Sequence, residues 1–184
     1  MGIQGTNNKR AALRRLAFVA AAASMPACAP AHAADQSGTA NAAVVRPNTL
    51  IKTDDLDFGT LVSSPTAGTA TINPVTNART TSGGVTPAGT TPQRAVFQGT
   101  GGILLITVTG DNSVTLTRAG GGTMTATLVR AATTSGGGIT ILGSSATLLP
   151  SGVQTYYIGG TLNVGANQPA GDYSGTFTLT VNYL

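Results

Sequence analysis

The sequence predicts an all-β protein, and three observations carry that prediction. Of its 184 residues, 25 are Gly and 31 are Thr, whereas Glu is absent. Thr favours strands and Gly favours turns, while helix surfaces are usually filled with Glu, Lys, Arg and Ala. Charged residues make up only 9 % of the chain, against roughly 25 % in an average soluble domain. Finally, short β-type segments alternate with Gly, Pro, Asn and Ser, a pattern typical of a β-sandwich or barrel.

The first 33 residues predict a secretory signal peptide. Four basic residues between positions 9 and 15 precede an apolar run over 16–23, and Ala31-His32-Ala33 provides a small-x-small cleavage site. The apolar run is far shorter than the roughly 20 residues that a membrane-spanning helix needs. We therefore expect a mature chain that begins at Ala34 and has no stable membrane span.

The side chains missing from the expected mature chain exclude several kinds of site. Cys28 and His32 are the only Cys and His, and both lie in the signal, while Glu and Trp are absent throughout. Ser-His-Asp and Cys-His catalysis, Cys/His zinc sites and disulfides are thereby excluded. Six Lys and Arg balance six Asp after position 33, so no basic patch for nucleic acid is expected. We expect no enzymatic activity, no cofactor and no metal.

The coarse strand pattern predicts one domain over residues 49–184. A clear hairpin is expected where Gly110-Asp111-Asn112 joins two of the segments, because these residues tolerate tight turns. Long loops are expected over Ser63–Gly68, Asn77–Pro92 and Thr133–Gly138. The expected strands are Thr49–Lys52, Leu56–Val62, Ala70–Asn73, Arg94–Gln98, Ile103–Thr109, Ser113–Thr117, Met124–Arg130, Ile139–Leu142, Ala146–Leu149, Gln154–Ile158, Thr161–Val164 and Tyr173–Tyr183.

The last of these strands is the most informative segment. It alternates strictly with period two to the end of the chain, which indicates a strand with one buried face. Nothing follows a terminal strand to cover its edge, so it pairs easily with another chain. With the glycine that precedes them, the residues of the apolar face are our candidates for a subunit-pairing or chaperone-pairing strand: Gly171, Tyr173, Gly175, Phe177, Leu179, Val181 and Tyr183.

Gly171, the alternating face and the penultimate Tyr183 resemble the C-terminal motif of chaperone–usher pilins. The segments 157–162 and 169–173 also resemble spore-coat-U-like and archaic fimbrial subunits. Residues 55–59, Asp-Leu-Asp-Phe-Gly, resemble the opening of a related secreted family, the domain-of-unknown-function family numbered forty-four-zero-two. Together the resemblance covers most of residues 49–184.

This resemblance implies an immunoglobulin-like, pilin-like β-sandwich that lacks its last strand. In the family, donor-strand complementation completes the sandwich: an N-terminal arm from the next subunit fills the groove by β-augmentation. The implied partners are further copies of the chain, a periplasmic chaperone and an outer-membrane usher.

Residues 34–48 are the expected flexible N-terminal arm, in which Ala40, Ala42 and Val44 alternate as candidate donor residues. Two functions stay open at this point. One is a structural subunit of a bacterial surface fibre, exported to the periplasm and then to the cell surface. The alternative is a self-complete secreted sandwich that acts as a monomeric adhesin or envelope protein. Asp54, Asp55 and Asp57 lack the spacing of a calcium loop, so a solvated turn is expected there.

Overall fold

The computed structural model describes residues 36–44, 47–89, 91–100, 104–133, 137–148 and 153–184. The chain divides into two compact units, Met1–Ala42 and Ala43–Leu184. In the first unit, the described residues 36–42 are exposed and carry no helix or strand. The second unit holds all the strands described below. The predicted all-β class is confirmed, because the described residues form strands and no helix.

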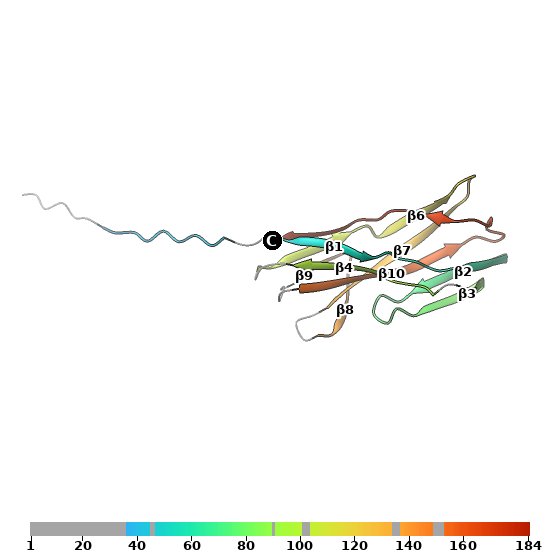
Figure 1. The fold of residues 1–184 in the computed structure, drawn as a ribbon, viewed down its shortest axis with the longest axis horizontal. Helices are drawn as coiled ribbons and strands as arrows, with labels where there is room; N and C mark the ends of the chain where they lie inside the picture. Colours follow the sequence, from blue (N-terminus) through green and yellow to red (C-terminus); the bar gives the residue numbers. More distant parts are fainter. Residues whose placement is uncertain (1–35, 45–46, 90, 101–103, 134–136, 149–152) are drawn as a thin grey trace, which may run out of the picture. The chain divides into compact units, whose positions relative to one another are not determined.

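The larger sheet of the second unit has nine antiparallel strands, in the order β1-β4-β10-β7-β6-β11, with β2 on β10, β3 on β2 and β8 on β7. Figure 1 shows β10 and β7 along the middle of the domain, with the other strands of this sheet flanking them. The strands are β1 (Thr49–Asp54), β2 (Leu61–Ile72), β3 (Arg79–Pro87), β4 (Ala95–Thr100), β6 (Ser113–Arg118), β7 (Thr123–Thr133), β8 (Ile139–Leu142), β10 (Val153–Val164) and β11 (Tyr173–Ser174).

The smaller sheet has the order β12-β5-β9 and packs on the larger one. Its strands are β5 (Ile106–Gly110), β9 (Ser145–Leu148) and β12 (Leu179–Tyr183). Side chains of both sheets share one hydrophobic core, in which Ile106 and Leu179 come from the smaller sheet and Tyr156 and Ile158 from the larger. The fold is therefore a β-sandwich, with alternate residues of each strand directed into the core.

The predicted hairpin around Gly110-Asp111-Asn112 is wrong, because β5 and β6 belong to different sheets. The turn instead carries the chain across the sandwich. The buried Arg130 side chain holds this corner: its guanidinium donates to the carbonyl oxygen of Asp111 and to Oδ1 of Asn112, each at 2.7 Å. The same guanidinium reaches Ser144 O at 3.0 Å, in the turn between β8 and β9.

Two of the predicted loops contain strand instead. Most of Asn77–Pro92 is occupied by β3, which pairs with β2, and Ser63–Gly68 lies inside β2 as a bulge. The predicted strand Leu56–Val62 keeps only the bridge Asp57↔Gln93 and the first residues of β2. Glycines explain the error, because Gly84 lies where a Cβ would come within 2.0 Å of Thr66 O. Here glycine permits close approach of two strands rather than marking a loop.

The same effect joins two predicted strands into one. Gln154–Ile158 and Thr161–Val164 are parts of the continuous β10, which passes through Gly159 and Gly160 without a turn. A Cβ on Gly159 would lie 2.3 Å from Ile72 O, and one on Gly160 would lie 2.3 Å from Thr127 O. β10 can thus pair with β4 along its first half, with β2 along its second half and with β7 across both.

Candidate functional site

The C-terminal segment does not form the single strand that its alternation predicts. β11 pairs with β6 in the larger sheet, with Tyr173 opposite Arg118, whereas β12 pairs with β5 in the smaller sheet, with Leu179 opposite Gly110. Residues 175–178 cross between the two sheets. A Cβ on Gly175 would lie 2.4 Å from Thr115 O, so the crossing passes directly against the backbone of β6. The period-two alternation of apolar residues indicates which face of the segment is buried, but it does not indicate that the segment passes from one sheet to the other.

The face that the alternation assigns to the core does pack against it. Leu179 is buried, and Phe177, Val181 and Tyr183 are half-buried against the core. Phe177 meets Phe97 of β4 edge-on, with the ring centroids 6.2 Å apart. The intervening Thr178 is exposed. The remaining three candidates, Gly171, Tyr173 and Gly175, lie nearer the start of the segment, where the sandwich is hollowed.

This hollow, which we call the open groove, has a volume of about 770 Å³. Residues 56–63 line one wall and residues 168–173 line the other. The floor is apolar and consists of Leu116, Met124, Leu162 and Val164. Strand pairing places these four side chains on one face of the sheet, since Leu116 lies opposite Met124 and Leu162 opposite Ala126. Leu116 and Met124 are only half-buried, although they point to the interior face.

The first wall is fixed by the Asp-Leu-Asp-Phe-Gly motif. Asp57 exchanges two backbone hydrogen bonds of 2.8 Å with Gln93, and its carboxylate accepts the Gly59 N–H at 2.7 Å. Gly59 has a φ of 71°, which an L side chain rarely adopts. Phe58 is buried, and its carbonyl oxygen accepts Arg79 Nη1 at 2.8 Å. The motif therefore turns the chain off the end of β1 and anchors it over the sheet.

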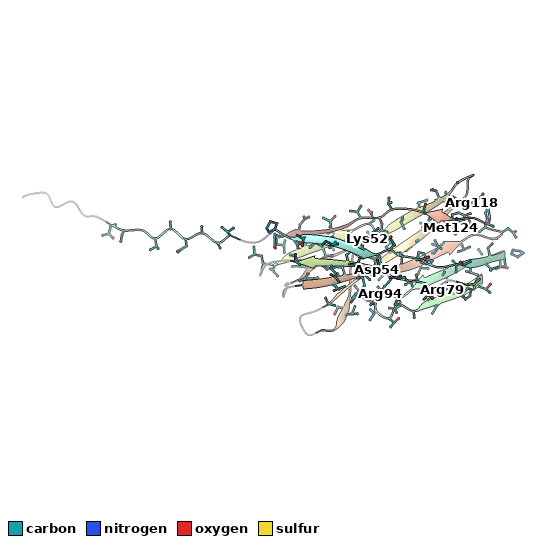
Figure 2. The ribbon with its side chains drawn as sticks, in the orientation of Figure 1. Lys52, Asp54, Arg79, Arg94, Arg118 and Met124 are labelled. Atoms are coloured by element: carbon teal, nitrogen blue, oxygen red, sulfur yellow. The ribbon has the colours of Figure 1, made fainter. Side chains whose placement is uncertain are left out.

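The second wall is the segment 168–173, which we call the strap, and side-chain hydrogen bonds hold it in place. The Tyr173 hydroxyl donates to Pro169 O at 2.8 Å and accepts from Gln168 Nε2 at 2.8 Å. Arg118 Nη1 donates to Ala170 O at 2.9 Å. Ser63 Oγ donates to Gln168 O at 3.1 Å, and beside it the Asn167 amide donates to Ser64 O at 2.8 Å, so the two walls are tied together at one end. Figure 2 shows Arg118 and Met124 in the same part of the domain.

Both sheets of the sandwich have strands with a single pairing partner. In the described part of the chain, β1 pairs only with β4 and β12 pairs only with β5, so each is an edge strand of its sheet. Gly143 and Ser144 alone connect β8 of the larger sheet to β9 of the smaller sheet. Residues 56–63, the first wall of the groove, follow β1 along the chain, whereas residues 168–173, the second wall, lead into β11.

The structure describes all three candidate donor residues. Ala40, Ala42 and Val44 are exposed and belong to no strand, and Val44 is 98 % exposed. The remainder of the expected arm, residues 34–35 and 45–46, lies outside the described residues, as does the expected signal peptide at 1–33.

The aspartates near the end of β1 make local contacts only. Asp55 accepts Lys52 Nζ at 2.5 Å, and Asp54 accepts the Thr53 hydroxyl at 3.2 Å. Among the described residues, no group of three or more His, Cys, Asp or Glu is placed to hold a metal ion. In that same part of the chain we find no helix of the length and apolarity that crossing a membrane demands.

Burial raises the pKa of Tyr156 to about 12, and its hydroxyl contacts Gln154 Oε1 inside the core.

Sequence reasoning missed the floor of the groove. Leu116, Met124, Leu162 and Val164 lie in segments that were predicted as strands, and all four sit at core-facing positions of the alternation. Their pattern signals burial, yet it does not tell which part of the inner face another strand covers. That information lies in the pairing of segments that are far apart in sequence.

Comparison with protein families identifies the domain. Residues 49–183 match a family described as a domain of unknown function, DUF4402, and the chain belongs to that family. The numbered family that residues 55–59 resemble is thereby confirmed. Neither the curated proteins nor the solved structures include a significant match to the chain.

Proposed function

We propose that this chain is a structural subunit of a bacterial surface fibre, and that it assembles by β-strand donation between copies. The observation that supports this most directly is the open groove, whose apolar floor lies on the inner face of the larger sheet, with Leu116 and Met124 only half-buried. The proposed occupant is the N-terminal arm of a second copy, inserted between residues 56–63 and 168–173. Alternate arm residues Ala40, Ala42 and Val44 would face the floor.

The energy available to such an arm is large enough to matter. About six paired residues would form several backbone hydrogen bonds at roughly 0.5–1.5 kcal/mol each. Burial of apolar surface adds roughly 25 cal/mol per Å². Their sum is comparable to the whole stability of a small domain, roughly 5–15 kcal/mol. A subunit with an empty groove would therefore have a low free energy of unfolding, and a subunit with a filled groove would have a much higher one.

The proposal includes export and assembly partners. The signal-like segment at 1–33 supports secretion through the inner membrane to the periplasm and then to the cell surface. Before assembly the groove would expose Leu116 and Met124 to water, so a periplasmic chaperone that lends a strand fits this intermediate. An outer-membrane usher would then exchange that strand for the arm of the next subunit. The proposed role is structural, and no catalytic step is part of it.

Removing the donor tests the proposal. Deletion of residues 35–47 should abolish fibres and leave an aggregation-prone subunit with a lowered melting temperature. A synthetic peptide of residues 34–48, added in excess, should bind that subunit and restore its melting temperature. A well-folded monomer that ignores the peptide would contradict strand donation and favour the self-complete adhesin or envelope protein.

Altering the acceptor provides a matched control. Met124 and Thr125 are neighbours on β7, but Met124 lies on the groove floor and Thr125 is exposed on the opposite face. Met124→Asp places a charge under the donated strand and should stop peptide binding and fibre formation. Thr125→Asp should leave both unchanged. Circular dichroism of both variants separates a lost groove from a lost fold.

A further inference from the structure

The strand-bearing unit carries a small group of exposed leucines on its surface. Seven large hydrophobic side chains are exposed in the described part of the chain: Val44, Ile51, Val62, Leu104, Leu105, Ile141 and Leu184. We call Leu104, Leu105 and Leu184 the leucine cluster, with exposed fractions of 40 %, 47 % and 71 %. Such side chains scattered singly need no explanation, whereas neighbouring exposed apolar side chains are candidates for an interaction site.

Backbone contacts bring the cluster together beside the start of β1. The amide of Leu184 donates to Leu105 O at 3.0 Å. Thr49, the first residue of β1, pairs with Thr100, and Leu104 follows Thr100 by four residues, which reach at most about 14 Å. Figure 1 shows the C terminus and the start of β1 at the same end of the domain, whereas β11, β2 and β3 lie toward the other end.

The length of the tether decides what meets this end. Five residue steps separate Val44, the last candidate donor residue, from Thr49, and five steps span at most about 17 Å. If Val44 is seated in the groove of a second copy, the start of β1 must lie within that distance of the groove. The linker between the two subunits is therefore short, and it holds the end of the donating subunit that carries the leucine cluster close to the groove walls of the accepting subunit.

We propose that the leucine cluster is a second contact between fibre subunits, and that it packs against the rim of the open groove of the accepting copy. This inference rests on the proposed strand donation. The rim offers an apolar counterpart, since Val62 on one wall is 52 % exposed and Pro169 on the other is also exposed. The contact would convert a tethered pair into a pair with fixed orientation, and it would stiffen the fibre.

The test uses the full mature chain and a matched pair of variants. The double variant Leu104→Asn/Leu184→Asn replaces two of the three leucines of the cluster and changes no residue of the arm or of the groove lining. The control is Ile141→Asn on β8, which replaces an aliphatic side chain that is 58 % exposed away from the leucine cluster. The concentration needed for half-maximal assembly is measured by light scattering, and fibre stiffness is measured as persistence length in electron micrographs.

We expect the leucine variant to require about tenfold more protein for assembly, equivalent to about 1.4 kcal/mol, and to form more flexible fibres, while the control behaves as wild type. Assembly equal to that of the control would overturn the leucine contact. A fluorescent peptide of residues 34–48, which competes with the arms for the groove, reports separately on strand donation. Peptide binding with equal assembly refutes the leucine contact alone, whereas absence of peptide binding to wild type refutes strand donation and this inference with it.

Discussion

Gly175 is where the C-terminal segment leaves one sheet for the other, and a single methyl group there should be costly. In Gly175→Ala the new Cβ would lie 2.4 Å from Thr115 O and 2.9 Å from Val114 Cγ2. Both distances are below any normal Cβ contact, and the nearest atom belongs to the backbone of β6, which cannot rotate away. Either β11 or the crossing at 175–178 must shift. Overpacking of this kind typically costs roughly 1–3 kcal/mol.

Gly143→Ala is the matched control for this substitution. Gly143 lies outside the positive-φ region, and its nearest Cβ neighbour would be Ser145 O at 3.7 Å, an ordinary contact. Replacing such a glycine reduces the entropy of the unfolded chain and stabilises by roughly 0.4–1 kcal/mol. The two variants make the same chemical change, so the difference between them isolates the close approach at Gly175.

The assay is urea unfolding of the mature protein, followed by far-ultraviolet circular dichroism. All samples are held at one protein concentration, because subunit association shifts apparent stability. We expect Gly175→Ala to lower the transition midpoint and Gly143→Ala to leave it unchanged or raise it. With an m-value of roughly 1–3 kcal/mol per M of urea, each kcal/mol corresponds to a shift of about 0.3–1 M in the midpoint. Equal midpoints for the two variants would show that the chain does not cross between sheets as described.

Three further predictions concern the terminal face, the buried phenol and the expected signal. By the same assay, Leu179→Ala should lower the free energy of unfolding by roughly 2–5 kcal/mol, whereas Thr178→Ala on the exposed side should lower it by well under 1.5 kcal/mol. Equal losses would mean that the alternation does not report burial. Burial raises the pKa of Tyr156 to about 12, so the stability that its neutral phenol contributes is complete below about pH 10 and is lost as the pH rises toward 12. Tyr156→Phe should therefore reduce the fall of the unfolding free energy between about pH 10 and pH 12. An unchanged fall would assign the alkaline loss of stability to other groups. Intact-mass analysis of the exported protein should show loss of the first 33 or 34 residues, and recovery of the full-length chain would remove the basis for export.

The sequence was sufficient for the fold class because that class depends on local properties. Thr-rich segments, sparse charge and frequent glycine favour strands and turns wherever they occur. The buried face of the C-terminal segment was also predictable, since Leu179 and Thr178 differ in exposure as period two requires. These inferences need only a residue and its immediate neighbours.

Pairing partners were not predictable on that basis. Gly110-Asp111-Asn112 has the composition of a hairpin turn, yet it carries the chain between sheets, because Arg130 satisfies its carbonyl and amide oxygens from β7. The glycines of β10 have the composition of a break, yet they serve the close approach of β2 and β7. In each case the decisive contact is with a residue distant in sequence, which no local pattern contains.

The open groove combines both kinds of information, and this explains why only half of it could be foreseen. Its walls carry recognisable motifs, the Asp-Leu-Asp-Phe-Gly turn and the Gly171–Tyr173 strap, because each wall must hold an unusual local conformation with hydrogen bonds of its own. The floor needs nothing unusual, since Leu116 and Met124 are ordinary core residues by pattern. In this structure both side chains are half-buried and line the open groove. A strand supplied by a second copy would complete their burial, and the same interior face would then satisfy both the fold of one subunit and the assembly of the next.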